Sequence, residues 1–231
     1  MKAKLFLVAT PIGNLQDISL RAIEVLKQID FIACEDTRQA KKILNKFSIS
    51  SQTISFHQRS NPEKIIKLLH QNKNIALISD SGTPLISDPG SDLIQSVLQN
   101  NFTVSPLPGS SAFLSALICS GFSLHHFEFL GFIPHKKGRQ KFLQNIALLP
   151  HTSVFYESTH RILKFCQQAK EFFPQKEICL AREMTKLHEE FIRGKADKIL
   201  DFLIQNPYKQ KGEFTVVVSK IIHPKPLHPF S

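Results

Sequence analysis

Long apolar runs are missing from this sequence. A membrane-spanning helix needs about 18 consecutive apolar residues, and no stretch of the chain approaches that length. The short apolar run after Lys4 ends in Pro11-Ile12-Gly13-Asn14 instead of the small-residue cleavage site of a signal peptide. We therefore expect a soluble, cytoplasmic protein with no membrane partner.

Cysteine is scarce as well, and its spacing does not point to metal or redox chemistry. The four cysteines are far apart, lie among apolar neighbours and include no C-x-x-C pair, which favours buried thiols in a reducing cytosol. The adjacent His125 and His126 would point in different directions on a helix or a strand. No histidine pair has the spacing of metal ligands, so we expect no metal site.

Three common ligand and nucleophile motifs are absent. There is no G-x-G-x-x-G after the first apolar run, no G-x-x-x-x-G-K-[ST] and no G-x-S-x-G. A dinucleotide or a nucleoside triphosphate would therefore lack its usual phosphate cradle. We expect a ligand held by backbone groups and apolar walls, with few charges.

Acidic residues are fewer than basic ones. The chain has 29 Lys and Arg against 19 Asp and Glu, a formal net charge of +10 and a pI near 9.5. Such a charge attracts anionic partners at long range, although it does not by itself identify a nucleic acid. With 231 residues, 42% of them hydrophobic, the chain is long enough for two α/β domains, which we place at residues 1–119 and 120–231.

Strands and helices alternate five times in the first half of the chain. This rhythm predicts a parallel sheet with helices on both faces. The second half mixes strands more densely with helices, so some of its strands must be antiparallel. The segment 224–231, which holds three prolines, is expected to be disordered. The predicted strands of the first half cover residues 5–9, 31–34, 53–56, 75–78 and 102–105.

The stretch Ile75 to Gly90, IALISDSGTPLISDPG, organises this first half. Its apolar start reads as a buried strand, and turn-forming residues stop that strand and leave a loop at its C-terminal end. Open α/β sheets bind ligands at this edge. Four polar loops follow strands of the predicted sheet, which favours a binding cleft over ordinary turns; they are Thr10–Asn14, Glu35–Arg38, Ser79–Gly90 and Pro108–Ala112.

Eight stretches in order along the chain resemble the bacterial ribosomal RNA small subunit methyltransferase I family, a branch of the tetrapyrrole methylase superfamily. They are VATPIGNLQDISLRA (8–22), ACEDTR (33–38), SDSGTPLISDPG (79–90), PGSSA (108–112), GFIP (131–134), FYESTHRI (155–162), AREMTKLHEE (181–190) and KGEFTVVV (211–218).

This resemblance implies two α/β domains of the class III methyltransferase type with a ligand cleft between them, and a homodimer. It implies S-adenosylmethionine as methyl donor and transfer to the ribose 2′-oxygen of a cytidine in 16S rRNA of the small ribosomal subunit, not DNA. Many family members continue with a small helical domain, so the sequence, which ends at Ser231, resembles a short form lacking that C-terminal extension.

The resemblance also assigns residues to the methyl donor, from both halves of the chain. The loop Thr10–Asn14, which includes Pro11, is expected to close the cleft. Tyr156 is expected to pack against the adenine of the donor. The donor-binding residues implied are Pro11, Gly82, Thr83, Pro84, Leu85, Ile86, Ser111, Ala112, Tyr156, Arg182 and Gly212.

The chemistry expected is an in-line displacement at a sulfonium methyl, for which the enzyme aligns the hydroxyl and helps to remove its proton. The candidate catalytic residues are Asp36, Arg38 and Glu183, with His57 a further candidate base. A carboxylate at a strand end is as often a helix cap or an arginine partner. The candidate substrate-binding residues are Asn14, His57 and Arg161. Lys136, Lys137 and Arg139 are interpreted as an extension of a phosphate-binding track, and for Lys136 and Lys137 a solvated basic turn is the preferred alternative.

Two alternative functions stay open from the sequence. One is a small-molecule methyltransferase acting on a tetrapyrrole-like ring, which would need a broad apolar trough. The other is a non-catalytic RNA-binding protein that assists ribosome assembly. Replacing both Asp36 and Glu183 by Ala distinguishes the latter from an enzyme, because only an enzyme would lose its function.

Overall fold

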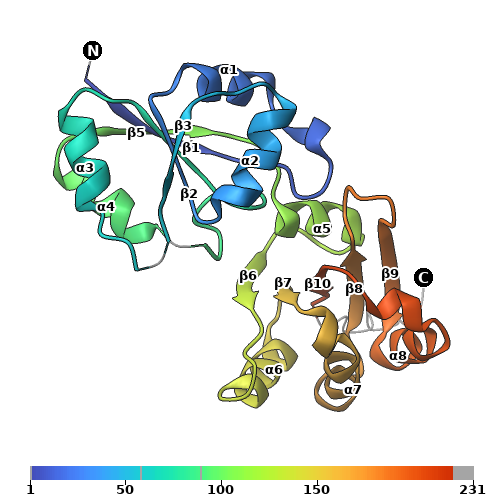
Figure 1. Ribbon diagram of the computed structural model, residues 1–231. Helices are drawn as coiled ribbons and strands as arrows, with labels where there is room; N and C mark the ends of the chain where they lie inside the picture. The colour runs from blue at the N-terminus through green and yellow to red at the C-terminus, as the bar shows by residue number, and fades with distance from the viewer. Residues whose placement is uncertain (1, 58, 89, 221–231) are drawn as a thin grey trace, which may run out of the picture. The chain divides into compact units, whose positions relative to one another are not determined.

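The computed structural model describes residues 2–57, 59–88 and 90–220. The segment expected to be disordered, 224–231, lies outside these residues. The chain divides between Ser111 and Ala112 into two compact units, and each unit is an α/β structure built on one five-stranded sheet (Figure 1). No helix in the described part of the chain is both long and apolar enough to cross a membrane.

The first unit contains a fully parallel sheet, as predicted from the alternation of strands and helices. Its strand order is β3-β2-β4-β1-β5, and every neighbouring pair is parallel. Its elements are β1 (Lys4–Val8), a 3-10 turn η1 (Leu15–Asp17), α1 (Leu20–Gln28), β2 (Phe31–Cys34), α2 (Thr37–Lys46), β3 (Gln52–Ser55), α3 (Glu63–His70), β4 (Ile75–Ile78), α4 (Ser91–Gln99) and β5 (Thr103–Leu107).

Helices cover both faces of this sheet. Helices α1 and α2 lie on one face, and α3 and α4 on the other (Figure 1). The central strand β4 is therefore buried along its whole length, which explains its continuous apolar sequence. The apolar side chains of each helix pack on their own face, Leu26 and Ile43 on the first and Ile65 and Val97 on the second.

The order of the strands places a switch point between β1 and β4. The chain leaves β1 toward β2 on one side of the sheet, and it leaves β4 toward β5 on the other. Where consecutive connections diverge in this way, a crevice opens at the carboxyl ends of the two strands, and ligands bind there. The strand order alone therefore locates a candidate ligand site, without reference to any sequence motif.

Side-chain oxygens accept backbone N–H groups at the starts of α1 and α3. Ser19 Oγ accepts the Ala22 N–H at 3.1 Å, and Asn61 Oδ1 accepts the Glu63 N–H at 2.9 Å. Each bond satisfies a donor that the first helical turn leaves unpaired.

The second unit contains a mixed sheet, in agreement with the expectation of antiparallel strands. Its order is β6-β7-β10-β8-β9; β6 and β7 are parallel and the other pairs are antiparallel. Its elements are α5 (Ala112–Ser120), β6 (Phe127–Phe132), α6 (Arg139–Leu148), β7 (Thr152–Glu157), η2 (Thr159–Arg161), α7 (Ile162–Phe172), β8 (Glu177–Arg182), β9 (Glu190–Lys195), α8 (Ala196–Gln205), η3 (Pro207–Gln210) and β10 (Phe214–Val218).

Strand β9 was not predicted from the sequence. Its residues Glu190–Lys195 include charged side chains and Gly194 and form no continuous apolar run. It lies at the edge of the sheet, where charged residues are common because they discourage pairing with another chain.

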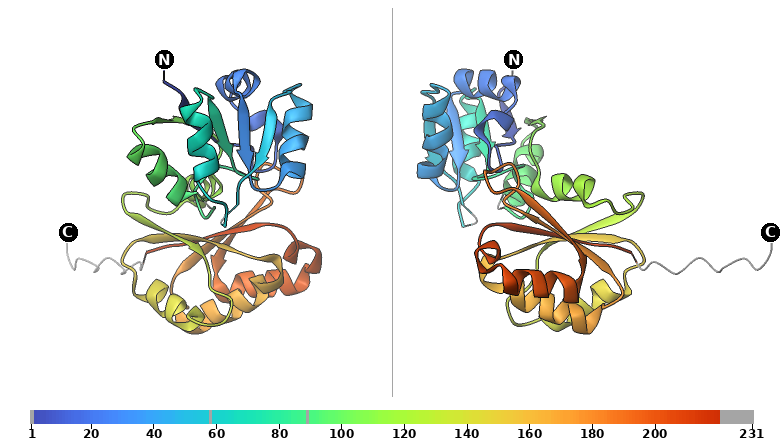
Figure 2. Two further views of the ribbon diagram at one scale, coloured as in Figure 1. Left: turned by 60° about the vertical axis from the view of Figure 1, so that its left-hand side comes forward. Right: turned by 90° about the vertical axis from the view of Figure 1, so that its right-hand side faces the viewer.

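The two faces of the second sheet are covered by different helices. Val216 and Val218 of β10 pack with α6, α7 and α8 on one face (Figure 2), so the alternate residues Thr215 and Val217 face the other. Helix α5 packs against β7, β8, β9 and β10. For this reason α5 belongs to the second compact unit, whereas the domain boundary expected from the sequence lay between residues 119 and 120.

A buried ion-pair cluster joins three elements of the second unit. Glu157, at the end of β7, contacts Arg139 at 2.8 Å and Arg161 at 3.0 Å, and its side chain is fully buried. Arg139 also donates to Gln168 and to the Pro134 carbonyl. The interpretation of Arg139 as part of an exposed phosphate track is therefore wrong, because this residue is 3% exposed and neutralises a buried carboxylate.

Candidate functional site

The loops after β1 and β4 are joined at the switch point of the first sheet. The Thr10 N–H donates to the Gly82 carbonyl at 2.9 Å, and the Gly82 N–H donates to the Thr10 carbonyl at 3.1 Å. The hydroxyls of Thr10 and Ser79 donate to carbonyls of the same loop. Both side chains are buried, so their hydroxyls are used within the loops.

The loop Ser79–Gly90 is tightly folded and strained. Leu85 and Ser87 have φ values of +73° and +64°, a region that residues with a Cβ rarely adopt. Gly82 has φ +84°, and a Cβ at this position would lie 3.2 Å from Ile12 Cγ2. Backbone strain of this kind is common at binding sites.

The loop after β5 is attached to the same region. Thr83 Oγ1 donates to the Ser110 carbonyl at 3.0 Å, so the predicted donor-binding residues Gly82, Thr83 and Ser111 come together. Ser111 Oγ is buried and has no hydrogen-bond partner among the described residues. A hydroxyl in this state suits a site where a bound molecule supplies the partner, so these residues fit a methyl donor.

Asp36 and Arg38 form a local pair at the start of α2. Asp36 caps the helix by accepting the Arg38 N–H at 2.8 Å, and its second oxygen pairs with the Arg38 guanidinium at 2.9 Å. The hydrogen bonds from Arg38 lower the pKa of Asp36 to about 2. A carboxylate of such low pKa is a weak proton acceptor at neutral pH, so the structure favours a capping role over that of a base.

A pocket that the sequence did not predict lies at the carboxyl ends of β2, β3 and β4. It has a volume of about 380 Å³, and its wall includes Glu35, Phe56, His57, Asp88 and Asp92. Burial, followed by the charges of Glu35 and Asp80, raises the pKa of Asp88 to about 6. The only signal in the sequence was the presence of Glu35 and His57 directly after predicted strands.

The raised pKa of Asp88 predicts a pH dependence of stability. The folded state holds the Asp88 proton up to about pH 6, whereas the ordinary pKa is 3.8. Between these values the folded state binds more protons, so stability falls as pH rises. Asp88→Asn should therefore raise the melting temperature relative to wild type at pH 8 more than at pH 4. An equal difference at the two pH values would contradict this assignment.

The remaining predicted residues of the first unit make local contacts. Asn14 caps the 3-10 turn η1 by accepting the Gln16 N–H at 3.0 Å. His57 Nδ1 accepts the Arg59 N–H at 3.2 Å, and the His57 ring lines the new pocket. Pro84 and Leu85 border a smaller cavity of about 10 Å³ under the same loop. The donor contacts expected for Pro11 and Ile86 stay predictions.

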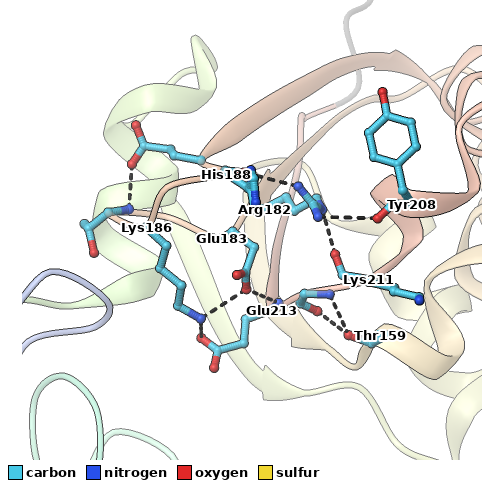
Figure 3. Close-up of polar contacts among 11 residues, drawn as sticks. Thr159, Arg182, Glu183, Lys186, His188, Tyr208, Lys211 and Glu213 are labelled. Atoms are coloured by element: carbon cyan, nitrogen blue, oxygen red, sulfur yellow. Dashed lines mark hydrogen bonds and ion pairs between the residues drawn. The ribbon is translucent and has the colours of Figure 1, made fainter.

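In the second unit, Glu183 is held by a cluster of polar contacts at the end of β8 (Figure 3). Its Oε1 accepts the Glu213 N–H at 2.8 Å and contacts Lys186 Nζ at 3.0 Å. Lys186 also contacts Glu213 Oε2 at 3.0 Å. Burial would raise the pKa of Glu183, but these contacts outweigh it and hold the pKa below its usual value.

The backbone around Glu183 is strained, and Gly212 packs closely against the Glu183 side chain. Glu183 and Thr185 have φ values of +50° and +63°. Gly212 has φ +113°, and a Cβ there would lie 2.6 Å from Glu183 Cγ. Thr159 Oγ1 both accepts the Gly212 N–H and donates to its carbonyl. The sequence analysis identified Glu183 and Gly212 but not Lys186, whose contact with Glu213 joins segments that are separated in the chain.

Arg182 has a structural role beside this cluster. It is 8% exposed and donates to the carbonyls of Lys211, His188 and Tyr208 (Figure 3). It therefore fixes the turns that flank Glu183 and Gly212. Its predicted contact with the methyl donor stays a prediction.

Tyr156 and Arg161 complete the set in the second unit. Tyr156 lies in an aromatic group, with ring centroids 5.3 Å from Phe129 and 5.0 Å from Phe132. Arg161 donates to Ser158 Oγ at 2.8 Å in addition to its pair with Glu157. Ala112 begins α5.

Among the described residues, no group of three or more His, Cys, Asp or Glu side chains is placed to hold a metal ion.

Known structures share this fold. Uroporphyrin-III C-methyl transferase from Thermus thermophilus, complexed with S-adenosyl homocysteine, superposes with a TM-score of 0.65 at 14% identity, over 95% of this chain and 99% of that one. A cobalamin biosynthetic enzyme, cobalt precorrin-4 methyltransferase, superposes with a TM-score of 0.67 at 14% identity, over 94% of both chains. At these identities the likeness establishes the fold alone, and it confirms the predicted two-domain class III type.

Sequence comparisons are more specific. The family profile "Tetrapyrrole (Corrin/Porphyrin) Methylases" matches residues 4–200. A ribosomal RNA small subunit methyltransferase I from Streptococcus pyogenes serotype M1 is 42% identical over 93% of this chain and 76% of its own length. The protein of the same name from Thermotoga maritima is 40% identical over 94% of this chain and 98% of its own length. The chain therefore belongs to the tetrapyrrole methylase family and, within it, to the ribosomal RNA small subunit methyltransferase I proteins, as the resemblance of its motifs implied.

Proposed function

We propose that this chain transfers a methyl group from S-adenosylmethionine to the ribose 2′-oxygen of a cytidine in 16S rRNA, within the small ribosomal subunit. The observation that carries the proposal is the identity of 40–42% over 93–94% of the chain to proteins named for methylation of small subunit ribosomal RNA. The net charge of +10 also suits an RNA substrate. The enzyme acts in the cytoplasm, as a homodimer.

The residues of the chain serve the reaction mainly by positioning. S-adenosylmethionine supplies an activated sulfonium methyl when it is bound. In the first unit, the backbone of the strained loop and the hydroxyl of Ser111 hold the donor. Because the methyl group is already activated, alignment of the ribose hydroxyl accounts for most of the rate enhancement.

The tetrapyrrole alternative is not favoured. The similarity to corrin and porphyrin methyltransferases is 14% in sequence and concerns the fold, whereas the relatives of high identity are named for ribosomal RNA. A non-catalytic assembly factor is disfavoured for the same reason, since these relatives are named as methyltransferases.

The proposal is tested with labelled S-adenosylmethionine and small ribosomal subunits that lack the modification. Naked 16S rRNA and a tetrapyrrole serve as parallel acceptors. We expect the label in one ribose of the subunit RNA, with resistance of the adjoining phosphodiester to alkali, because a methylated 2′-oxygen cannot attack it. Donor binding without label in any RNA would overturn the proposal.

Donor binding is tested at Gly82. Gly82→Ala should weaken S-adenosylmethionine binding about tenfold or more. The alanine Cβ would crowd the Ile12 side chain, and the backbone at this position has a φ of +84°. Gly138→Ala is the matched control, since Gly138 has φ +86° with nothing within 4 Å of its Cβ position. Titration calorimetry should show normal affinity for the control. Equal weakening in both variants would assign the effect to backbone strain instead of the site.

A further inference from the structure

The pocket at the carboxyl ends of β2, β3 and β4 adjoins the loop expected to hold the methyl donor. Ser87, Asp88 and Gly90 of this loop line it, and Asp88 also borders the smaller cavity lined by Pro84 and Leu85. The pocket therefore lies next to the predicted donor-binding residues 82–86, but none of those residues lines it. A volume of about 380 Å³ suits one small flat ring system.

The chemistry of the wall excludes a phosphate and favours a group with N–H donors. Although the protein has a net charge of +10, the described residues around this pocket include no lysine or arginine, and Glu35, Asp88 and Asp92 supply carboxyl groups. Phe56 supplies an apolar wall and His57 a flat ring. Flat apolar walls combined with hydrogen-bond acceptors are the features by which proteins hold an unstacked base.

We propose that this pocket receives the base of the target nucleotide, and that Glu35 and Asp88 are specificity-determining residues that accept the two N–H bonds of the cytosine amino group. The inference rests on the proposed function, because it takes the acceptor to be a cytidine. Carboxylates accepting from the cytosine amino group are an established mode of base recognition in nucleic-acid complexes.

Glu35 rejects uracil, as does Asp88 when its carboxyl group is ionised. Uracil presents the O4 acceptor where cytosine presents its amino group. That oxygen would face carboxylate oxygens without a proton between them, and such a repulsive contact discriminates against the wrong base.

The environment of Asp88 supports this assignment. Burial raises its pKa to about 6, so its carboxyl group takes up a proton more readily than an ordinary aspartate. A protonated carboxyl group donates one hydrogen bond and accepts another. Next to cytosine it can donate to N3 while it accepts from the amino group, and Glu35 then accepts the second amino hydrogen.

The test compares acceptors that differ in one base. Small subunits are reconstituted with 16S rRNA transcripts that carry either cytidine or uridine at the nucleotide that the wild-type enzyme labels. We expect wild type to favour cytidine by about 5-fold to 150-fold in kcat/KM. In Glu35→Gln this ratio should fall toward one, because the amide can donate to uracil O4. Asp88→Leu should lower kcat/KM for cytidine with unchanged donor affinity.

Controls separate the failure of this inference from failure of the proposed function. Glu63→Gln removes an exposed carboxylate at the start of α3 that does not line the pocket, and it should keep the wild-type ratio. If wild type labels no ribose at all, the proposed function fails. If wild type prefers cytidine and Glu35→Gln and Asp88→Leu both behave as wild type, the pocket inference is wrong and the proposed function stands.

Discussion

Replacing Glu157 by alanine is expected to lower the free energy of unfolding by about 3–5 kcal/mol, the loss typical of a buried ion pair deprived of one partner. The Glu157 side chain is fully buried, and those of Arg139 and Arg161 are 4% and 15% exposed. Alanine would leave the Arg139 guanidinium in the interior without its counter-ion. It would also remove the acceptor of the Ser158 N–H, which Glu157 Oε1 binds at 2.7 Å.

Urea-induced unfolding of the full chain measures this loss. The matched control is Lys73→Ala, which removes a surface pair with Asp30 at 3.1 Å whose side chains are 46% and 32% exposed, and it should cost less than about 1 kcal/mol. The double variant R139M/E157L should recover much of the stability, because no buried charge is then unpaired on the side of Arg139. A loss in Glu157→Ala no larger than in the control would show that the cluster contributes little.

Gly212→Ala is expected to reduce methyl transfer about 100-fold, the scale of an error of about 1 Å in the alignment of reacting groups. A Cβ at Gly212 would lie 2.6 Å from Glu183 Cγ and 2.9 Å from its Oε1. Glu183 would have to leave the Glu213 N–H and Lys186. The loss of methyl transfer would therefore have two causes, the displacement of the Glu183 carboxylate and the distortion of the turn at Gly212, whose φ is +113°.

The control for this variant is Gly121→Ala, which places alanine at φ +82° with nothing within 4 Å of the added Cβ. Both variants strain the backbone, and only Gly212→Ala disturbs Glu183. We expect kcat/KM of the control to stay near wild type and both proteins to show the same circular dichroism spectrum. Equal losses of activity in the two variants would contradict a role for the Glu183 contacts in the site.

The polar loops illustrate how far sequence patterns reach. Thr10, Gly82 and Ser111 were predicted to meet because each follows a strand of one parallel sheet, and the contacts between these loops confirm that Gly82 and Thr10 are joined directly. Asp88 belongs to the loop that contains Gly82, but its raised pKa depends on burial and on the charge of Glu35. Neither of these can be predicted from the sequence. Lys186 was missed for a similar reason, since its contact with Glu213 joins two separate segments of the second unit.

Local sequence patterns were sufficient to predict the fold wherever apolar residues recur with the period of a strand or a helix. The alternation of apolar runs and turn formers determined the parallel first sheet, because a buried strand and an amphipathic helix have different periods, and the ordered motifs determined the family. Tertiary structure alone decided that Arg139 is buried while Arg38 is exposed, because the sequence around an arginine does not show which carboxylate it will pair with. It also decided the place of β9 and of the pocket, because an edge strand and a cavity arise from packing between distant segments.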